Sequence, residues 1–177
     1  MKQFAITVIR LLCMINSYGQ KAVPNKIISN ADSIFIVSHL LTYESLVVDE
    51  NGKTRKQRFL IKNGFLNKSI IKEYVKLSKP EVDTLLAILN IPETASELNA
   101  IKCFSPHHGI VIFKNKMVSY IDICFDCLHI AVSNDIDDGF YFSTGTWKKL
   151  RTFFKSKKIH YQMNNDSALD HLHLNAK

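Results

Sequence analysis

The chain has 177 residues, enough for one domain with a single hydrophobic core. Hydrophobic residues make up 46% of the sequence and charged residues 22%, a balance that excludes a wholly disordered chain. The formal net charge is +7, which makes the protein mildly basic, and no apolar run reaches the roughly 20 residues that a membrane-spanning helix needs.

The first 19 residues have the pattern of a secretory signal peptide. Lys2 is basic, an apolar stretch runs from Phe4 to Ile15, and small residues lie just before Gln20. Arg10 interrupts the apolar stretch, and a buried first helix is the alternative interpretation. Cleavage near Gly19/Gln20 predicts a secreted or periplasmic protein and would remove one of the 4 cysteines. An oxidising compartment favours disulfides, but the remaining cysteines are odd in number and cannot all pair within the chain. One unpaired thiol is therefore expected, unless the cysteines bind a metal ion.

A first pair of strands is predicted in the N-terminal half. Residues from Ser33 onward are rich in isoleucine, valine, phenylalanine and tyrosine, which favour strands. Asn51-Gly52 predicts a hairpin, because both residues tolerate the positive φ of a type I′ turn. The returning strand, residues 53–62, would place Phe59 and Ile61 on one face and Arg58, Leu60 and Lys62 on the other.

An amphipathic helix is predicted to begin after Ser78. Ser78 and Glu81 have the spacing of a capping box, and Pro80 fits the first turn. One apolar stripe follows at helical spacing, and Pro92 ends the helix. The stripe consists of Val82, Leu85, Leu86 and Leu89.

A second hairpin is predicted from Gly109–Lys114 and Met117–Phe125, turning at Asn115-Lys116. The period of two separates its faces. One face carries Ile110, Ile112, Ile121 and Ile123, and the other carries Val111, Phe113, Val118 and Tyr120. Because both faces are apolar, we expect the hairpin to lie centrally in its sheet.

A last helix is predicted after Ser143 or Thr144, either of which can cap it. Its apolar positions are Trp147, Leu150, Phe153 and Phe154, and its basic positions are Lys148, Lys149, Arg151 and Lys155. No stacking aromatic residues are interleaved with the basic ones, so we expect a solvated face and no nucleic-acid partner. The simplest assembly is an α+β domain at residues 20–161, an antiparallel sheet of two hairpins with two helices packed on it, followed by a flexible tail at residues 162–177.

Cysteines and histidines gather at the open end of the second hairpin. A two-residue turn at Asn115-Lys116 places His107 opposite Cys124, within the roughly 5 Å that separates cross-strand neighbours. Cys103 precedes this pair and Cys127 follows it, so all four residues can converge. A shift of one residue in the register would exchange His107 for His108.

Three interpretations of this cluster remain open. A structural zinc site would use Cys103, His107, Cys124 and Cys127, with His108 as a substitute for His107, because Cys124-x₂-Cys127 has zinc-ligand spacing. A disulfide from Cys103 to Cys124 or to Cys127 would instead leave one thiol buried. A thiol- or metal-dependent enzyme would use Cys124 with His107, for which Asp122 is the one visible orienting acid.

The segments "CFSPHHGIVIF", "YIDICFDC" and "WKKLRTFF" resemble a group of small exported bacterial proteins of unknown function. This resemblance implies export and a role for the cysteines, and it implies no mechanism. We therefore expect an exported, non-enzymatic domain with a binding or envelope accessory role and a protein or envelope partner. An immunity or interaction protein that acts through its surface is a further hypothesis.

Overall fold

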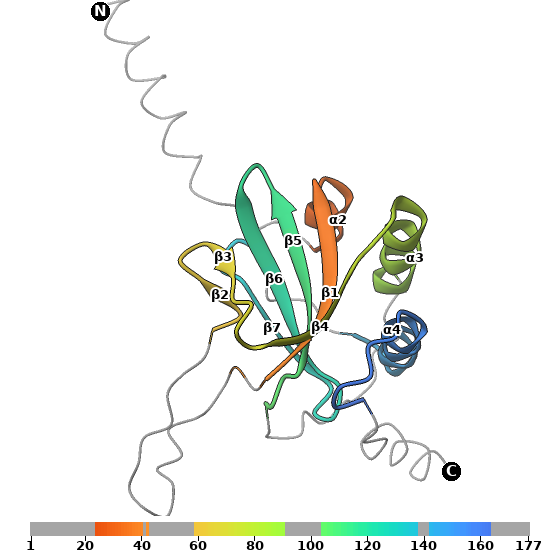
Figure 1. Ribbon diagram of the computed structural model, residues 1–177. Coiled ribbons are helices and arrows are strands. Elements are labelled where there is room, and N and C mark those ends of the chain that lie inside the picture. The colour runs from red at the N-terminus through yellow and green to blue at the C-terminus, as the bar shows by residue number, and fades with distance from the viewer. Residues whose placement is uncertain (1–23, 41, 43–58, 91–103, 138–141, 164–177) are drawn as a thin grey trace, which may run out of the picture.

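The computed structural model describes residues 24–40, 42, 59–90, 104–137 and 142–163, and it shows the predicted α+β architecture (Figure 1). The helices are α2 (Pro24–Ser29), α3 (Lys79–Leu89) and α4 (Thr144–Ser156). The strands are β1 (Ser33–His39), β2 (Ile61–Lys62), β3 (Phe65–Leu66), β4 (Ile71–Lys76), β5 (His108–Lys114), β6 (Met117–Cys124) and β7 (His129–Val132).

The main sheet has five antiparallel strands in the order β4-β1-β5-β6-β7. β5 lies at its centre, so the prediction that the second hairpin is central is confirmed. All three described helices lie on one side of this sheet, and the small β2–β3 hairpin lies on the other (Figure 1).

The β5–β6 hairpin has the predicted turn and register. Asn115 and Lys116 both have positive φ, 50° and 66°, as a type I′ turn requires. His108 pairs with Ile123, and Lys114 pairs with Met117. The four isoleucines predicted for the core face have no exposed surface, and they pack under the helices.

The opposite face of the sheet has a smaller apolar cluster, made of Val37, Leu60, Ile70 and Val111. The β2–β3 hairpin covers this cluster at one end of the sheet. Of the predicted returning strand, only Ile61 and Lys62 among the described residues form a strand, and just before it Leu60 is 3% exposed whereas Phe59 is 54% exposed. The two strands turn at Asn63 and Gly64 and are only two residues long each, too short to show an alternating pattern.

Both predicted helices are confirmed, including their caps. In α3, Glu81 Oε2 accepts the Ser78 backbone N–H at 2.7 Å, as a capping box requires. In α4, the Ser143 hydroxyl accepts the Thr146 N–H at 3.2 Å. The interpretation of Arg151 as a solvated residue is wrong, because its side chain is buried and donates to the Met163 carbonyl at 2.9 Å.

Helix α2 was not predicted, because it has only six residues and lies in a stretch that reads as a polar lead-in. The predicted signal peptide (residues 1–19), the Asn51-Gly52 turn and nearly all of the predicted tail lie outside the described residues. Met163 has no exposed surface, so packing extends at least that far. Within the described part of the chain, no helix combines the length and the apolar character that crossing a membrane demands.

Candidate functional site at the histidine end of the sheet

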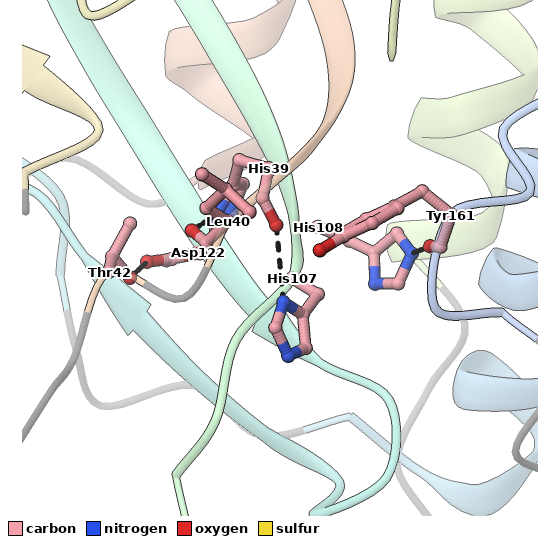
Figure 2. A network of polar contacts seen from close by, with 7 residues as sticks. All are labelled: His39, Leu40, Thr42, His107, His108, Asp122 and Tyr161. Carbon is pink, nitrogen blue, oxygen red and sulfur yellow. Dashed lines mark hydrogen bonds and ion pairs between the residues drawn. The ribbon is translucent and has the colours of Figure 1, made fainter. Parts of the chain in front are cut away.

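Three polar residues meet inside the sheet beside the predicted cysteine and histidine cluster (Figure 2). His39, at the end of β1, and Asp122, near the C-terminal end of β6, are both buried, and His39 Nε2 lies 2.9 Å from Asp122 Oδ1. The Thr42 hydroxyl donates to the second oxygen of Asp122 at 2.8 Å. Both oxygens of this buried carboxyl group are therefore bonded.

The protonation state of His39 follows from its partners. Its Nδ1 lies 2.8 Å from the Leu40 carbonyl oxygen, which can only accept, so Nδ1 carries a hydrogen. Its Nε2 faces the Asp122 carboxylate and donates the second bond. Burial alone would lower the pKa of His39, but the hydrogen bond and charge of Asp122 outweigh burial and raise it above the usual value. Asp122 therefore favours the imidazolium form of His39.

His107 and His108 are adjacent in sequence but make separate contacts, as Figure 2 shows. His107 is half-buried and donates from Nδ1 to the His39 carbonyl at 3.1 Å. His108 is buried on the helix side, where its Nε2 donates to the Tyr161 carbonyl at 2.9 Å. Burial lowers the pKa of both rings, that of His108 to about 3, so both are neutral at pH 7.

The two described cysteines differ in chemical state. Cys124 is a free thiol with 1% of its surface exposed, and its sulfur accepts the Cys127 backbone N–H at 3.2 Å. Burial raises the pKa of Cys124, and this effect outweighs the backbone N–H groups of Ser105 and Cys127 that point at the sulfur. The thiol is therefore protonated and inert at neutral pH. Cys127 is disulfide-bonded, and its partner is not among the described residues.

The predicted zinc site stays a prediction. Cys103, one of its four ligands, lies outside the described residues. Among the residues that the structure does describe, no group of three or more histidine, cysteine, aspartate or glutamate side chains is arranged to hold a metal ion. A cysteine in a disulfide has no thiolate to offer, so the disulfide of Cys127 and a zinc bond at Cys127 exclude each other.

The predicted catalytic pair does not have a catalytic arrangement in the described residues. No hydrogen bond joins Cys124 to His107 there, and Asp122, the expected orienting acid, is bonded to His39 and Thr42 instead. His39 was not predicted as a site residue. Asp122 could have indicated a buried polar partner, because an aspartate inside a strand of buried apolar residues requires one.

Comparisons of this chain with protein-family models, with curated proteins and with solved structures found no match. The resemblance to small exported bacterial proteins stays a prediction. The function is therefore inferred from the geometry of the histidine end and from the exposed surfaces.

Proposed function

We propose that this protein is an exported, non-enzymatic binding domain whose cysteine and histidine end serves as a structural clamp. The proposal rests on the protonation and burial of the Cys124 thiol and on the hydrogen bonds of the His39 ring. The Cys124 thiol is protonated and buried, and both ring nitrogens of His39 are bonded within the protein. A nucleophile or a general base needs an accessible atom beside a bound substrate.

The second part of the proposal is a disulfide between Cys103 and Cys127. Cys127 is disulfide-bonded and Cys124 is free, so among the 4 cysteines only Cys13 and Cys103 are possible partners. Cys13 belongs to the proposed signal peptide. The remaining pairing closes the segment around His107 and suits an oxidising compartment. Closing a loop of this size stabilises the fold by about 3 kcal/mol in the chain-entropy description.

Thiol counting by mass spectrometry tests both parts. The mature protein is treated with iodoacetamide without a reductant, first folded and then in guanidinium chloride. We expect no labelling of the folded protein, one label on Cys124 after unfolding, and a proteolytic fragment that links Cys103 to Cys127. Cys124→Ala is the matched control, because it removes the thiol that is proposed to be free and leaves the proposed disulfide intact.

Two other results would contradict the proposal. Rapid labelling of Cys124 in the folded protein would indicate an accessible nucleophile and favour the enzyme hypothesis. Three labelled thiols after unfolding, together with stoichiometric zinc in the untreated protein, would favour the zinc interpretation.

A further inference from the structure

The β2–β3 hairpin presents aromatic and basic side chains to solvent. Lys62 pairs with Phe65 across the hairpin, so their side chains lie on one face, and both are exposed. Phe65 has 74% of its surface exposed, and Phe59, just before the hairpin, has 54%. Lys68, just after the hairpin, is exposed as well. The hairpin and its flanks therefore expose two phenylalanines beside two lysines.

The remaining contacts of the hairpin hold these side chains outward. Its other face carries Ile61 and Leu66, which pair with each other and pack against the apolar cluster on the main sheet. The Asn67 side chain donates to the Phe59 carbonyl at 3.0 Å, and the Asn67 backbone N–H donates to the Leu60 carbonyl at 2.8 Å. Because the inner face is packed and the base is bonded, the fold itself determines which side chains are exposed.

The sequence around the hairpin carries only positive charge. Residues 53–71 contain 6 of the 23 lysines and arginines of the chain and none of its 16 acidic residues. The basic residues are Lys53, Arg55, Lys56, Arg58, Lys62 and Lys68. This concentration of charge favours an anionic partner.

The shape of the hairpin favours a membrane surface over a nucleic acid. Asn63 and Gly64 form a two-residue turn with φ of 53° and 77°, so Lys62 and Phe65 flank a convex tip. A Cβ at Gly64 would meet no atom within 4 Å, which places the tip in open space. Single-stranded nucleic acids bind along basic grooves lined by aromatic rings. A convex tip can instead enter the headgroup region of a bilayer, where a phenylalanine ring leaves no polar group unbonded.

We propose that the β2–β3 hairpin docks the protein on an anionic phospholipid membrane. Phe65 and Phe59 enter the boundary between the headgroups and the acyl chains, while Lys62 and Lys68 contact the phosphate groups. The protein lies on the membrane surface and does not cross it. This inference rests on the proposed function, because export brings the domain to the envelope, and it names the partner class of the binding domain.

Vesicle sedimentation measures the binding. The mature protein is mixed with phosphatidylcholine vesicles that contain about one third phosphatidylglycerol, or with vesicles of phosphatidylcholine alone. Each lysine at an anionic surface contributes about fivefold in affinity, so binding to the mixed vesicles should be at least about 20-fold tighter. Equal binding to both kinds of vesicle, or binding to neither at about 1 mM lipid, would overturn the proposal.

Tryptophan fluorescence reports which part of the protein meets the bilayer. Phe65→Trp and Met117→Trp each place a tryptophan at an exposed position, since the native side chains are 74% and 62% exposed, whereas the native Trp147 is buried. Met117 lies at the turn end of β5 and β6, and Leu60 anchors the β2–β3 hairpin near Gly109, at the other end of β5. The mixed vesicles should shift the emission of Phe65→Trp to shorter wavelength and leave that of Met117→Trp unchanged. Equal shifts in both variants would contradict docking through the hairpin.

Two pairs of lysine variants separate local docking from net charge. Lys62→Gln with Lys68→Gln removes two charges at the hairpin, and Lys114→Gln with Lys116→Gln removes two at the exposed β5–β6 turn. The first pair should weaken binding to the mixed vesicles by about 25-fold, and the second by less than about threefold. Equal weakening by the two pairs would show that net charge alone attracts the protein, and would overturn the assignment of the hairpin.

Phe65→Ala tests the entry of the ring into the bilayer. It should weaken binding by about tenfold and leave thermal unfolding unchanged, because the side chain is 74% exposed. Unchanged binding would overturn this part of the proposal. Single-stranded oligothymidylate is the competing polyanion, and tighter binding to it than to the mixed vesicles would replace the membrane by a nucleic acid.

The vesicle test and the thiol test can fail independently. A linked Cys103–Cys127 fragment with no vesicle binding would leave the proposed function in place and remove only the membrane partner. Rapid labelling of folded Cys124 would remove the non-enzymatic domain, whatever the vesicles do.

Discussion

The two faces of the main sheet are built from different kinds of side chain. The helix side holds the larger apolar core, and its buried histidine, His108, is neutral and packed against Phe125 and Phe154. The opposite face combines a small apolar cluster under the β2–β3 hairpin with the buried ion pair of His39 and Asp122. This comparison indicates that the helix side buries most of the apolar surface and therefore provides most of the stability.

The largest expected difference between the faces is the cost of losing a phenylalanine. Phe154 has no exposed surface and stacks edge-on with Phe125 at 5.5 Å, so Phe154→Ala should lower the free energy of unfolding by about 4 kcal/mol. Phe113, half-buried on the opposite face beside Phe35, is the matched position, and Phe113→Ala should cost about 1 kcal/mol. Equilibrium unfolding in guanidinium chloride measures both. Equal costs would contradict the division between the faces.

Acid should destabilise the helix side through His108. Its pKa in the folded protein is about 3, below the ordinary value of 6.5, so protons bind preferentially to the unfolded chain as the pH falls. The contribution of neutral His108 to the free energy of unfolding is complete above pH 6.5 and is lost as the pH falls toward 3. The loss is about 3 kcal/mol at pH 4. His108→Gln keeps a donor for the Tyr161 carbonyl but does not titrate. The loss between pH 7 and pH 4 should therefore be smaller in this variant, and an unchanged loss would contradict the assignment.

A smaller effect is expected where the β2–β3 hairpin packs on the opposite face. A Cβ at Gly109 would lie 3.2 Å from the Ile121 carbonyl oxygen and 3.3 Å from Leu60 Cδ2. Gly109→Ala should therefore cost about 1–2 kcal/mol by overpacking. Gly145→Ala is the control, because its Cβ would meet only Ser143 Oγ at 3.7 Å and alanine favours the helix. Thermal unfolding that shows equal changes in both variants would contradict close packing of the hairpin on the sheet.

Short sequence patterns predicted the β5–β6 turn and the starts of α3 and α4, because interactions between neighbouring residues determine these features. The Asn115-Lys116 turn fixed the register of β5 and β6, because a two-residue turn leaves one pairing of the strands. Ser78 and Ser143 located the starts of α3 and α4, because capping side chains act within one turn of the helix.

The residues missed by the sequence analysis depend on contacts between distant segments. His39 and Asp122 are 83 positions apart, and they meet only because β1 pairs with β5 and β5 pairs with β6. Arg151 sits at a position that an isolated helix would expose, and its burial depends on the chain returning to place Met163 beside it. The β2–β3 strands are too short for a periodic pattern.

We propose that His39 and Asp122 form a structural ion pair in which neither ring nitrogen of His39 is available as a catalytic base. The most direct measurement is the ¹⁵N chemical shift of the His39 ring nitrogens as a function of pH. The raised pKa predicts that both nitrogens still carry hydrogen in most molecules at pH 6.5, and that the pair's contribution to stability is complete below pH 6.5 and lost as the pH rises through the folded pKa. Asp122→Asn should lower the pH at which the ring loses its proton. A His39 ring that titrates at or below 6.5, as an exposed or merely buried histidine does, would contradict the account.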